Sequence, residues 1–237
     1  MDLFAQQWAS YRAVVEHDLM EHRAVAEATA AALEGWIEAR GPQATPARLV
    51  DLGCGDLALL APLLQRLPLG TYTGLDLTAA VLPLAQQALG DVAYPCRWLE
   101  GDLLHWASDP IRDDTAQIDI LHSAFAIHHL SESQKQAFLE AARARIAPGG
   151  LFIWADVFRE PSESRDLYVQ RYLQRIRGSW PQLTPEQQEH VCNHLATFDQ
   201  PAERGAIEAT AQVAGWQWRW AWNGAHRAEA VAVLTPA

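Results

Sequence analysis

Basic residues are scarce in this chain of 237 residues. Its 18 Lys and Arg stand against 29 Asp and Glu, which gives a formal net charge of -11 at pH 7. Proteins that bind DNA or RNA gather Lys and Arg against the phosphates, so this balance argues against a nucleic-acid partner. No run of basic residues changes that expectation.

Cysteines and long apolar runs are also missing. The three cysteines, Cys54, Cys96 and Cys192, form no CxxC pair, which argues against a disulfide framework or a zinc knuckle and favours a reducing cytoplasm. No apolar stretch approaches the ~18 residues that span a bilayer. The first residues, MDLFAQQWASYR, lack a secretory apolar core. We therefore expect a cytoplasmic protein without a membrane partner.

Strand-like and helical patterns alternate through the middle of the chain. Half of the residues are apolar, enough for the core of one large α/β domain. Helical patterns occur at 57–67, 79–88 and 133–146, and apolar strand-like runs occur at 48–51, 72–75, 97–99, 118–122 and 151–155. Such alternation predicts parallel strands with right-handed crossovers, that is, a doubly wound sheet.

The two ends of the chain differ from this middle part. Residues 3–40 read as helical, and the turn-like GPQATP ends them. Near the other end, WQWRWAW alternates strictly and a short link joins it to EAVAVL, so these two strands must be antiparallel. We expect four parts: a helical cap at 1–46, a core at 47–157, a helical insertion at 158–215 and a terminal hairpin at 216–237.

Tryptophan recurs at every second position of the first hairpin strand. The strand pattern places these side chains on one face, where core packing under a helix is the expected role. A stacking platform for bases is disfavoured because no basic groove accompanies them. The residues are Trp216, Trp218, Trp220 and Trp222.

A glycine turn in LVDLGCGDLALL (residues 49–60) predicts a nucleotide-type site. Gly53 and Gly55 let backbone approach a ligand, and a helix expected to begin near Asp56 offers unpaired N–H groups. Asp76 ends the next strand, where an acidic residue commonly binds a ribose hydroxyl pair. Its ordinary role would be a helix N-cap, although Thr78 could fill that role instead.

Two ligands compete for this turn. Gly53, Gly55 and Ala58 satisfy the G-x-G-x-x-A fingerprint of NAD-binding proteins. Asp51, two residues before the first glycine, argues against NAD because its carboxylate would repel a pyrophosphate. A ligand with an ammonium group and a sulfonium, such as S-adenosylmethionine, suits that carboxylate better.

Five stretches carry a resemblance to a known family. DLGCGD, GLDL, EGDL, IDILHSAFAIHHLSESQ and APGGLFIWAD, in order over roughly residues 49–157, resemble the class I S-adenosylmethionine-dependent methyltransferases of small molecules. The resemblance implies a Rossmann-like doubly wound sheet of seven strands, mostly parallel with a C-terminal antiparallel hairpin, plus a helical cap. Leu57 departs from the family, since it replaces the usual third glycine of DxGxGxG.

The resemblance also implies which residues bind S-adenosyl-L-methionine. Asp76 would bind the ribose hydroxyls, Asp102 would accept from the adenine amino group, and Ser123 would lie beside the methionine part. Asp102 could instead be an ordinary turn residue. The full expected set is Asp51, Gly53, Cys54, Gly55, Asp76, Leu77, Gly101, Asp102, Leu103, Ser123 and Ala124.

Two adjacent histidines follow the fourth predicted strand. By resemblance, His128 falls where small-molecule O-methyltransferases carry a catalytic histidine, whereas His129 is expected to pack. The alternative is that both lie at a helix start capped by Ser131. No metal is expected, because no Asp/Glu cluster has facial spacing. His190 and His194 share one face of a helix that begins after Thr184, but packing is favoured over a zinc site there.

The sequence therefore predicts an enzyme that transfers a methyl group from S-adenosylmethionine to a small organic molecule. Aromatic side chains in the cap and insertion are candidates to line the acceptor pocket, namely Tyr11, Tyr168, Tyr172 and Trp180. Two alternatives stay open: an NAD-dependent oxidoreductase, and a catalytically silent protein that binds S-adenosylmethionine or S-adenosylhomocysteine. The acceptor and the oligomeric state are left undefined.

Overall fold

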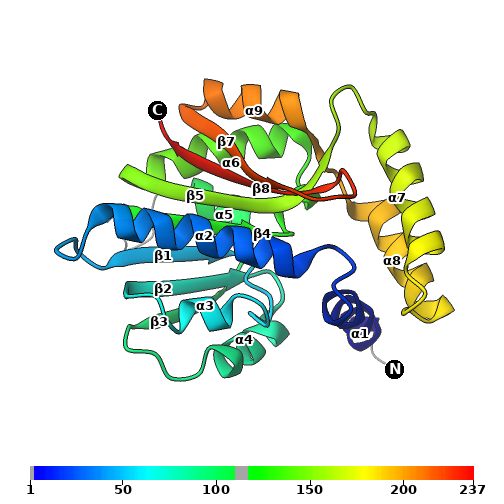
Figure 1. The fold of residues 1–237 in the computed structure, drawn as a ribbon, viewed down its shortest axis with the longest axis horizontal. Helices are drawn as coiled ribbons and strands as arrows, with labels where there is room; N and C mark the ends of the chain where they lie inside the picture. The colour runs from blue at the N-terminus through cyan, green and yellow to red at the C-terminus, as the bar shows by residue number, and fades with distance from the viewer. Residues whose placement is uncertain (1–2, 110–116) are drawn as a thin grey trace.

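A seven-stranded mixed sheet forms the centre of the molecule (Figure 1). The computed structural model describes residues 3–109 and 117–237, with the side chains of 3–7 left out. The strand order is β3-β2-β1-β4-β5-β8-β7, and the two-residue β6 pairs with β5 outside this path. The five strands β1–β5 are parallel, while β8 pairs antiparallel with both β5 and β7. The expected doubly wound sheet with an antiparallel C-terminal hairpin is confirmed.

The strands extend beyond their apolar cores as read from the sequence. Their bounds are β1 Ala47–Leu52, β2 Leu69–Asp76, β3 Cys96–Glu100, β4 Ile118–Ala124, β5 Ile146–Arg159, β6 Ala202–Glu203, β7 Trp216–Asn223 and β8 Glu229–Pro236. Strand β5 is the longest, and every residue from 150 to 158 in it is buried. A strand covered on both faces reads as a continuous apolar run, which explains this composition.

Helices cover both faces of the sheet (Figure 1). Their bounds are α1 Leu3–Glu16, α2 His22–Arg40, α3 Ala61–Leu64, α4 Leu82–Leu89, α5 Leu103–Ser108, α6 Glu132–Arg145, α7 Arg165–Ser179, α8 Pro185–Phe198 and α9 Arg204–Val213, with short 3-10 turns η1 Ala79–Val81 and η2 Ile127–His129. Side chains of α2, α3 and α4 pack on one face of the sheet. Those of α5, α6 and α9 pack on the other.

The tryptophans of β7 do not all share one face. Trp216, Trp218 and Trp220 pack in the cluster beneath α9, around Trp154 and Phe158. The pairing of β7 with β8 shifts register between Trp220 and Trp222, and Trp222 packs in the cluster of the opposite face. A bulge places one extra residue in a strand and so reverses the direction of the side chains beyond it. Core packing is thus confirmed for all four tryptophans, whereas the expectation that they share one face was wrong for Trp222.

Helix α3 is much shorter than the pattern at 57–67 predicts. Residues 53–60 form turns, and the helix begins only at Ala61. The expected helix start near Asp56 was wrong because Leu57 has a φ of 57°, in the left-handed region that no right-handed helix contains. By contrast, the capping boxes at Ser131 and Thr184 begin α6 and α8 as the sequence predicts.

Helices α7 and α8 stand beyond the carboxyl ends of the parallel strands, together with α1 (Figure 1). They share a third apolar cluster, which includes Tyr172 and Trp180. The fully buried Glu229 of β8 ties α7 to the hairpin, because it accepts from Tyr172 Oη at 2.5 Å and pairs with Arg175 at 2.6 Å. We refer to α7 and α8 as the lid.

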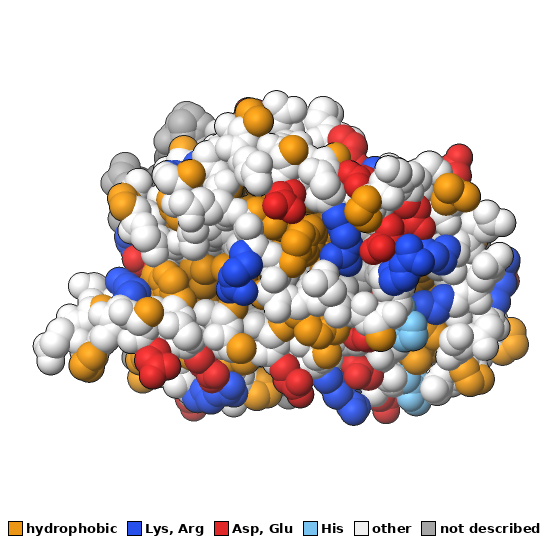
Figure 2. Space-filling view, turned by 45° about the horizontal axis from the view of Figure 1, so that its top comes forward, with side chains coloured by type: hydrophobic (Ala, Val, Ile, Leu, Met, Phe, Trp, Pro, Cys, Tyr) orange, Lys and Arg blue, Asp and Glu red, His pale blue; other side chains and the backbone are white. Residues whose placement is uncertain are grey.

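The four-part division of the chain stays a prediction, although two helices lie elsewhere than it implies. Helix α2 packs on β5, β7 and β8, and α9 packs on β7 and α6, so both belong to the layers of the core. On the face shown in Figure 2, basic side chains are separated by acidic ones rather than gathered in one stripe. Among the described residues, no helix is long and apolar enough to cross a membrane, and the cytoplasmic location stays a prediction.

Candidate functional site

The glycine turn after β1 is packed against the turn after β4. Gly53 has a φ of 73°, and a Cβ built on it would lie 2.5 Å from the Cβ of Ala126. Gly55 has a φ of 54° and open space where its Cβ would be. Leu57 keeps a left-handed φ of 57° while its side chain is buried. The turn therefore keeps a left-handed backbone at the position of the missing third glycine, at a cost of about 1–2 kcal/mol for a residue with a Cβ.

Asp76 holds the glycine turn in place from the end of β2. Its carboxylate accepts from the N–H of Gly55 at 2.9 Å and from the N–H of Thr78 at 2.8 Å. Burial raises the pKa of Asp76, and these two N–H groups act in the opposite direction. Next to it, the side chain of Leu77 is 70% exposed. An acidic group beside an exposed apolar one at a strand end fits a ribose and its base.

Asp51 lies below the turn in a buried polar group. Its carboxylate accepts from Tyr72 Oη at 3.0 Å and lies 2.7 Å from Nδ1 of His122. Both carboxylate oxygens are therefore engaged inside the protein. Asp51 also lines the cavity at the turn. Its two internal partners hold the carboxylate in a fixed position there.

Asp102 and Ser123 have local partners. Asp102 caps α5, since its Oδ1 accepts from the N–H of His105 at 2.7 Å, and Leu103 is the first residue of that helix. Ser123 is fully buried and donates to the carbonyl of Leu52 at 2.8 Å. Gly101 donates its N–H to the carbonyl of Asp76 at 2.9 Å, which holds these strand ends together.

A cavity of about 90 Å³ opens between the glycine turn and the end of β4. Five of the eleven residues expected from the sequence line it, namely Asp51, Gly53, Cys54, Gly55 and Ala124. His122, which was not expected, also lines it, and the other six expected residues do not. An added Cβ would collide at Gly53, and among the described residues no Lys or Arg lines the space. A neutral nucleoside with a cationic sulfur fits these groups, whereas a pyrophosphate would find no cation.

A second, larger cavity of about 330 Å³ lies under the lid. It shares Tyr11, His22 and Phe125 with the first cavity, so the two are neighbours. All four aromatic residues expected from the sequence line it, namely Tyr11, Tyr168, Tyr172 and Trp180. Burial lowers the pKa of His22 to about 4, against the pull of Asp18.

His128 is fixed in this cavity by a buried carboxylate. Its Nδ1 lies 2.6 Å from Oδ1 of Asp156, and its N–H donates to Oδ2 of Asp156 at 3.0 Å. Trp154 and the N–H of Val157 also donate to Asp156. This network assigns the proton of the ring to Nδ1 and turns Nε2 toward the cavity. Burial alone would lower the pKa of His128, but Asp156 and Asp199 outweigh it and raise the pKa to about 8.

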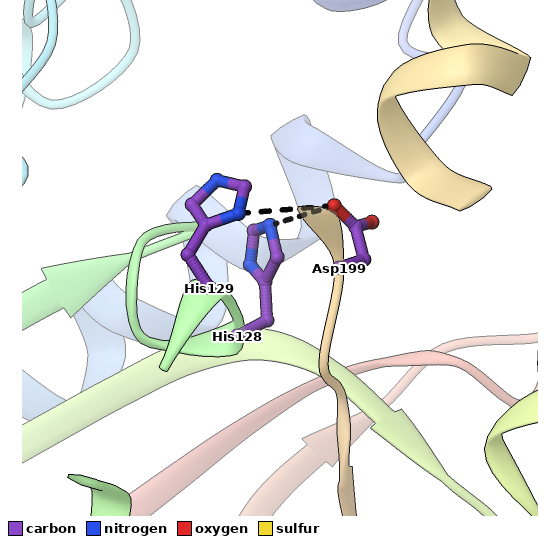
Figure 3. Close-up of side chains that lie close together, drawn as sticks. All are labelled: His128, His129 and Asp199. Atoms are coloured by element: carbon purple, nitrogen blue, oxygen red, sulfur yellow. Dashed lines mark ion pairs between the residues drawn. The ribbon is translucent and has the colours of Figure 1, made fainter. Parts of the chain in front are cut away.

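Asp199 stands opposite His128 and His129, just after α8 (Figure 3). Its Oδ1 lies 3.6 Å from Nε2 of His128, 3.9 Å from Nδ1 of His129 and 3.7 Å from Nε2 of His194. Burial raises the pKa of Asp199. Burial also lowers the pKa of His129 to about 3, and the neighbouring His128 and His194 act in the same direction. Three imidazoles thus surround one carboxylate oxygen.

The sequence indicated part of this site and missed the rest. His128 and the aromatic lining were expected, while Asp156, Asp199 and the partners of Asp51 were not. Asp156 has a signal, because an acidic residue stands inside an otherwise apolar strand run, WADVF. Asp199 has none, since it lies in an ordinary polar link after a helix.

The chain is similar to known proteins over its core. Residues 50–152 match the family model of a methyltransferase domain. An uncharacterized methyltransferase of Mycobacterium tuberculosis (strain ATCC 25618 / H37Rv) is 29% identical over 143 residues, 58% of this chain and 66% of that protein. The trans-aconitate 2-methyltransferase of Azoarcus sp. (strain BH72) is 31% identical over 113 residues, 48% of this chain and 40% of that protein. Both matches leave a third or more of the relative uncovered.

A solved structure extends the similarity to nearly the whole chain. The plantazolicin methyltransferase BpumL, in complex with a triazolic desmethylPZN analog and SAH, superposes with a TM-score of 0.65. The match covers 98% of this chain and 94% of that chain at 13% identity, which shows the fold alone. With the sheet order and the glycine turn, the family match over residues 50–152 and the methyltransferase relatives support a class I S-adenosylmethionine-dependent methyltransferase fold for this chain.

Proposed function

We propose that the protein transfers a methyl group from S-adenosylmethionine to a small organic molecule that binds under the lid. The observation that carries this proposal is the aromatic cavity of about 330 Å³. It is enclosed by α1, α7 and α8 and adjoins the glycine turn through Tyr11, His22 and Phe125. A cavity of this size suits a flat molecule rather than a polymer.

The residues of the turn would hold the cofactor, which supplies a methyl group on a cationic sulfur. Asp76 would accept from the ribose hydroxyls, and Leu77 with Asp102 and Leu103 would bind the base. The set expected from the sequence, from Asp51 to Ala124, stays a prediction in its individual roles. Positioning an acceptor at the shared wall and excluding water there can contribute roughly 7–11 kcal/mol of barrier lowering.

His128 is proposed as the general base for an acceptor that carries a proton. Asp156 keeps the proton on Nδ1, so Nε2 is the nitrogen available to accept another. Its pKa of about 8 is close to the working pH, which favours proton transfer in both directions. Phenols and hydroxylated heteroaromatic molecules combine such a proton with a ring that the aromatic wall can contact.

Support for a small acceptor also comes from the Azoarcus relative, whose name gives trans-aconitate as its substrate. The plantazolicin methyltransferase is similar to this chain in fold alone, so the superposition does not select the acceptor class. The family match removes the support for an NAD-dependent oxidoreductase. Measured turnover distinguishes the proposed methyltransferase from a catalytically silent binding protein.

A panel of phenols, heteroaromatic hydroxyl compounds and carboxylic acids, assayed with methyl-labelled S-adenosylmethionine, tests the proposal. For a hydroxyl acceptor, His128→Gln should lower turnover about 10²–10⁴-fold because a base acts only in the transition state. Its affinity for S-adenosylhomocysteine should match the parent. The exposed His226 supplies the control, and His226→Ala should turn over like the parent. If no acceptor is methylated although S-adenosylhomocysteine binds, the silent binding protein is the better description.

A further inference from the structure

The cluster around Asp199 has an unbalanced buried oxygen at its centre. The Asp199 side chain is only 9% exposed, and among the described residues its Oδ1 has no hydrogen-bond partner. Burying a carboxylate oxygen without a donor is unfavourable, because the group loses its water and gains no partner in return. Native proteins meet this cost with a donor, a water or a cation.

A single hydrogen-bond donor does not account for the surroundings of Asp199 Oδ1, because several nitrogens lie around it. His128 donates a hydrogen bond from its Nδ1–H to Asp156, and its Nε2 faces Oδ1 of Asp199 across 3.6 Å. This is too long for a hydrogen bond, so a protonated Nε2 forms only an ion pair with Oδ1, and an unprotonated Nε2 needs a cation between the two atoms. A single proton serves one such pair, whereas Oδ1 has three imidazole nitrogens at 3.6–3.9 Å.

We propose that His128, His129 and Asp199 bind a divalent transition-metal ion such as Zn²⁺ in the wall of the acceptor cavity and leave its fourth position open. Nε2 of His128, Nδ1 of His129 and Oδ1 of Asp199 lie within 4.8 Å of one another. In a tetrahedral zinc site, ligand atoms are about 3.3 Å apart. The distances from Asp199 Oδ1 to Nε2 of His128 and to Nδ1 of His129 exceed this by roughly 0.3–0.6 Å, so the site closes when these side chains and the two histidine nitrogens move together.

The supports around the cluster fit a metal ligand set. A histidine that binds a metal commonly donates its other ring N–H to a carboxylate, which fixes its orientation and increases its basicity. Asp156 provides that carboxylate for His128. Imidazole nitrogens with one carboxylate oxygen select zinc and similar ions over Mg²⁺ and Ca²⁺, which prefer oxygen ligands alone. The sequence predicts no metal, whereas this geometry favours one.

The metal site narrows the acceptor class of the proposed function. It rests on that function only in taking the cavity under the lid as the acceptor cavity. With the ion bound, His128 would be a ligand, and an acceptor hydroxyl in the open fourth position would release its proton to solvent more readily. The acceptor class narrows to molecules with a hydroxyl that reaches the wall formed by η2 and the end of α8. Without the ion, Nε2 of His128 is the proton acceptor.

The test measures ion binding without turnover. Protein freed of metal by a chelator is titrated with Zn²⁺ by calorimetry and with Co²⁺ by visible absorption, in the full chain. The parent should bind one ion per chain, unaffected by excess Mg²⁺. Asp199→Asn and His129→Ala should weaken the affinity at least about tenfold. His190→Ala is the matched control, because His190 lines the same cavity from α8 but its Nδ1 contacts Ser10 at 3.3 Å.

The outcomes separate this inference from the proposed function. Melting curves in chelator and S-adenosylhomocysteine binding establish that each variant is folded. A parent that binds no Zn²⁺, or an affinity that Asp199→Asn and His129→Ala leave unchanged, overturns the metal site while methyl transfer can still stand. An equal loss in His190→Ala would also overturn it, since the ion would lie elsewhere. Ion binding with no methylated acceptor refutes the proposed function and leaves the metal site intact.

Discussion

One added methyl group at Gly53 tests how the glycine turn after β1 packs against the turn after β4. The Cβ of an alanine at this position would lie 2.5 Å from the Cβ of Ala126, whereas carbon atoms in contact are about 3.5–4.0 Å apart. Relief requires a movement of about 1 Å in one of the two turns. Ala126 directly precedes η2, which carries His128, so the movement reaches both cavities.

The cost of Gly53→Ala has two parts. A φ of 73° is in the left-handed region, which costs a residue with a Cβ about 1–2 kcal/mol. Overpacking against Ala126 costs about 1–3 kcal/mol more. We therefore expect the free energy of unfolding, measured by urea denaturation, to fall by about 2–5 kcal/mol. The affinity for S-adenosylhomocysteine, measured by calorimetry, should fall as well because the turn has shifted.

Two further variants separate the parts. Gly55→Ala has a similar φ of 54° but open space around the new Cβ, so only the conformational cost of about 1–2 kcal/mol is expected. Ala126→Gly, introduced into Gly53→Ala, removes the collision and should recover about 1–3 kcal/mol. Equal losses in Gly53→Ala and Gly55→Ala, or no recovery in the double variant, would refute the close approach as the reason for a glycine here.

Three other expectations follow from the site and the lid. S-adenosylhomocysteine should raise the melting temperature and NAD should not, and Asp76→Ala should remove most of that rise while the exposed Asp91→Ala keeps it. The pKa of His22 is about 4 in the folded protein and 6.5 when unfolded, so the unfolded state binds more protons between these values. Stability should fall by about 3 kcal/mol as the pH drops from 6.5 to 4, and His22→Leu should lose this part of the slope in urea denaturation at each pH. Arg175→Ala should cost about 3–5 kcal/mol because it leaves the buried Glu229 charge unpaired, and adding Glu229→Gln should restore much of it; no recovery would mean that the arginine acts by packing instead.

The sheet was predictable because its signals are local. The apolar runs at 48–51, 72–75 and 118–122 are followed by helical patterns, and the WQWRWAW and EAVAVL runs are too close for a crossover. The strand ends then meet at one edge, which places Gly53, Asp76 and Ala124 near one another without any long-range information. The glycine turn follows from the same alternation.

Two local features were not predictable because packing overrides the pattern. Leu57 reads as the start of an apolar helix, yet it takes a left-handed conformation and fixes the turn in place of a glycine. Trp222 continues a strict alternation, yet a register shift turns it to the opposite cluster. Periodicity shows which residues are apolar, but it does not show where a residue is inserted into a ladder.

The cluster around Asp199 could not be predicted from the sequence for a different reason. His128 and His129 are carried by the core, while His194 and Asp199 are carried by the lid, and no spacing in the chain links the two pairs. The sequence expectation of no metal rested on ligands close together along the chain. Contacts between distant segments need the fold itself, which brings α8 across the end of β4.

This division has a consequence for how the acceptor is selected. The cofactor side is built from the ends of β1, β2 and β4, which the sheet holds in register. The acceptor side joins η2 of the core to α1, α7 and α8, which contact the sheet chiefly through the Glu229 network and the aromatic cluster. Substitutions in the lid can therefore reshape the acceptor cavity without moving the glycine turn. The Asp199 cluster also joins the lid to the core, so the ion proposed there would fix the lid in the position from which the proposed acceptor is held.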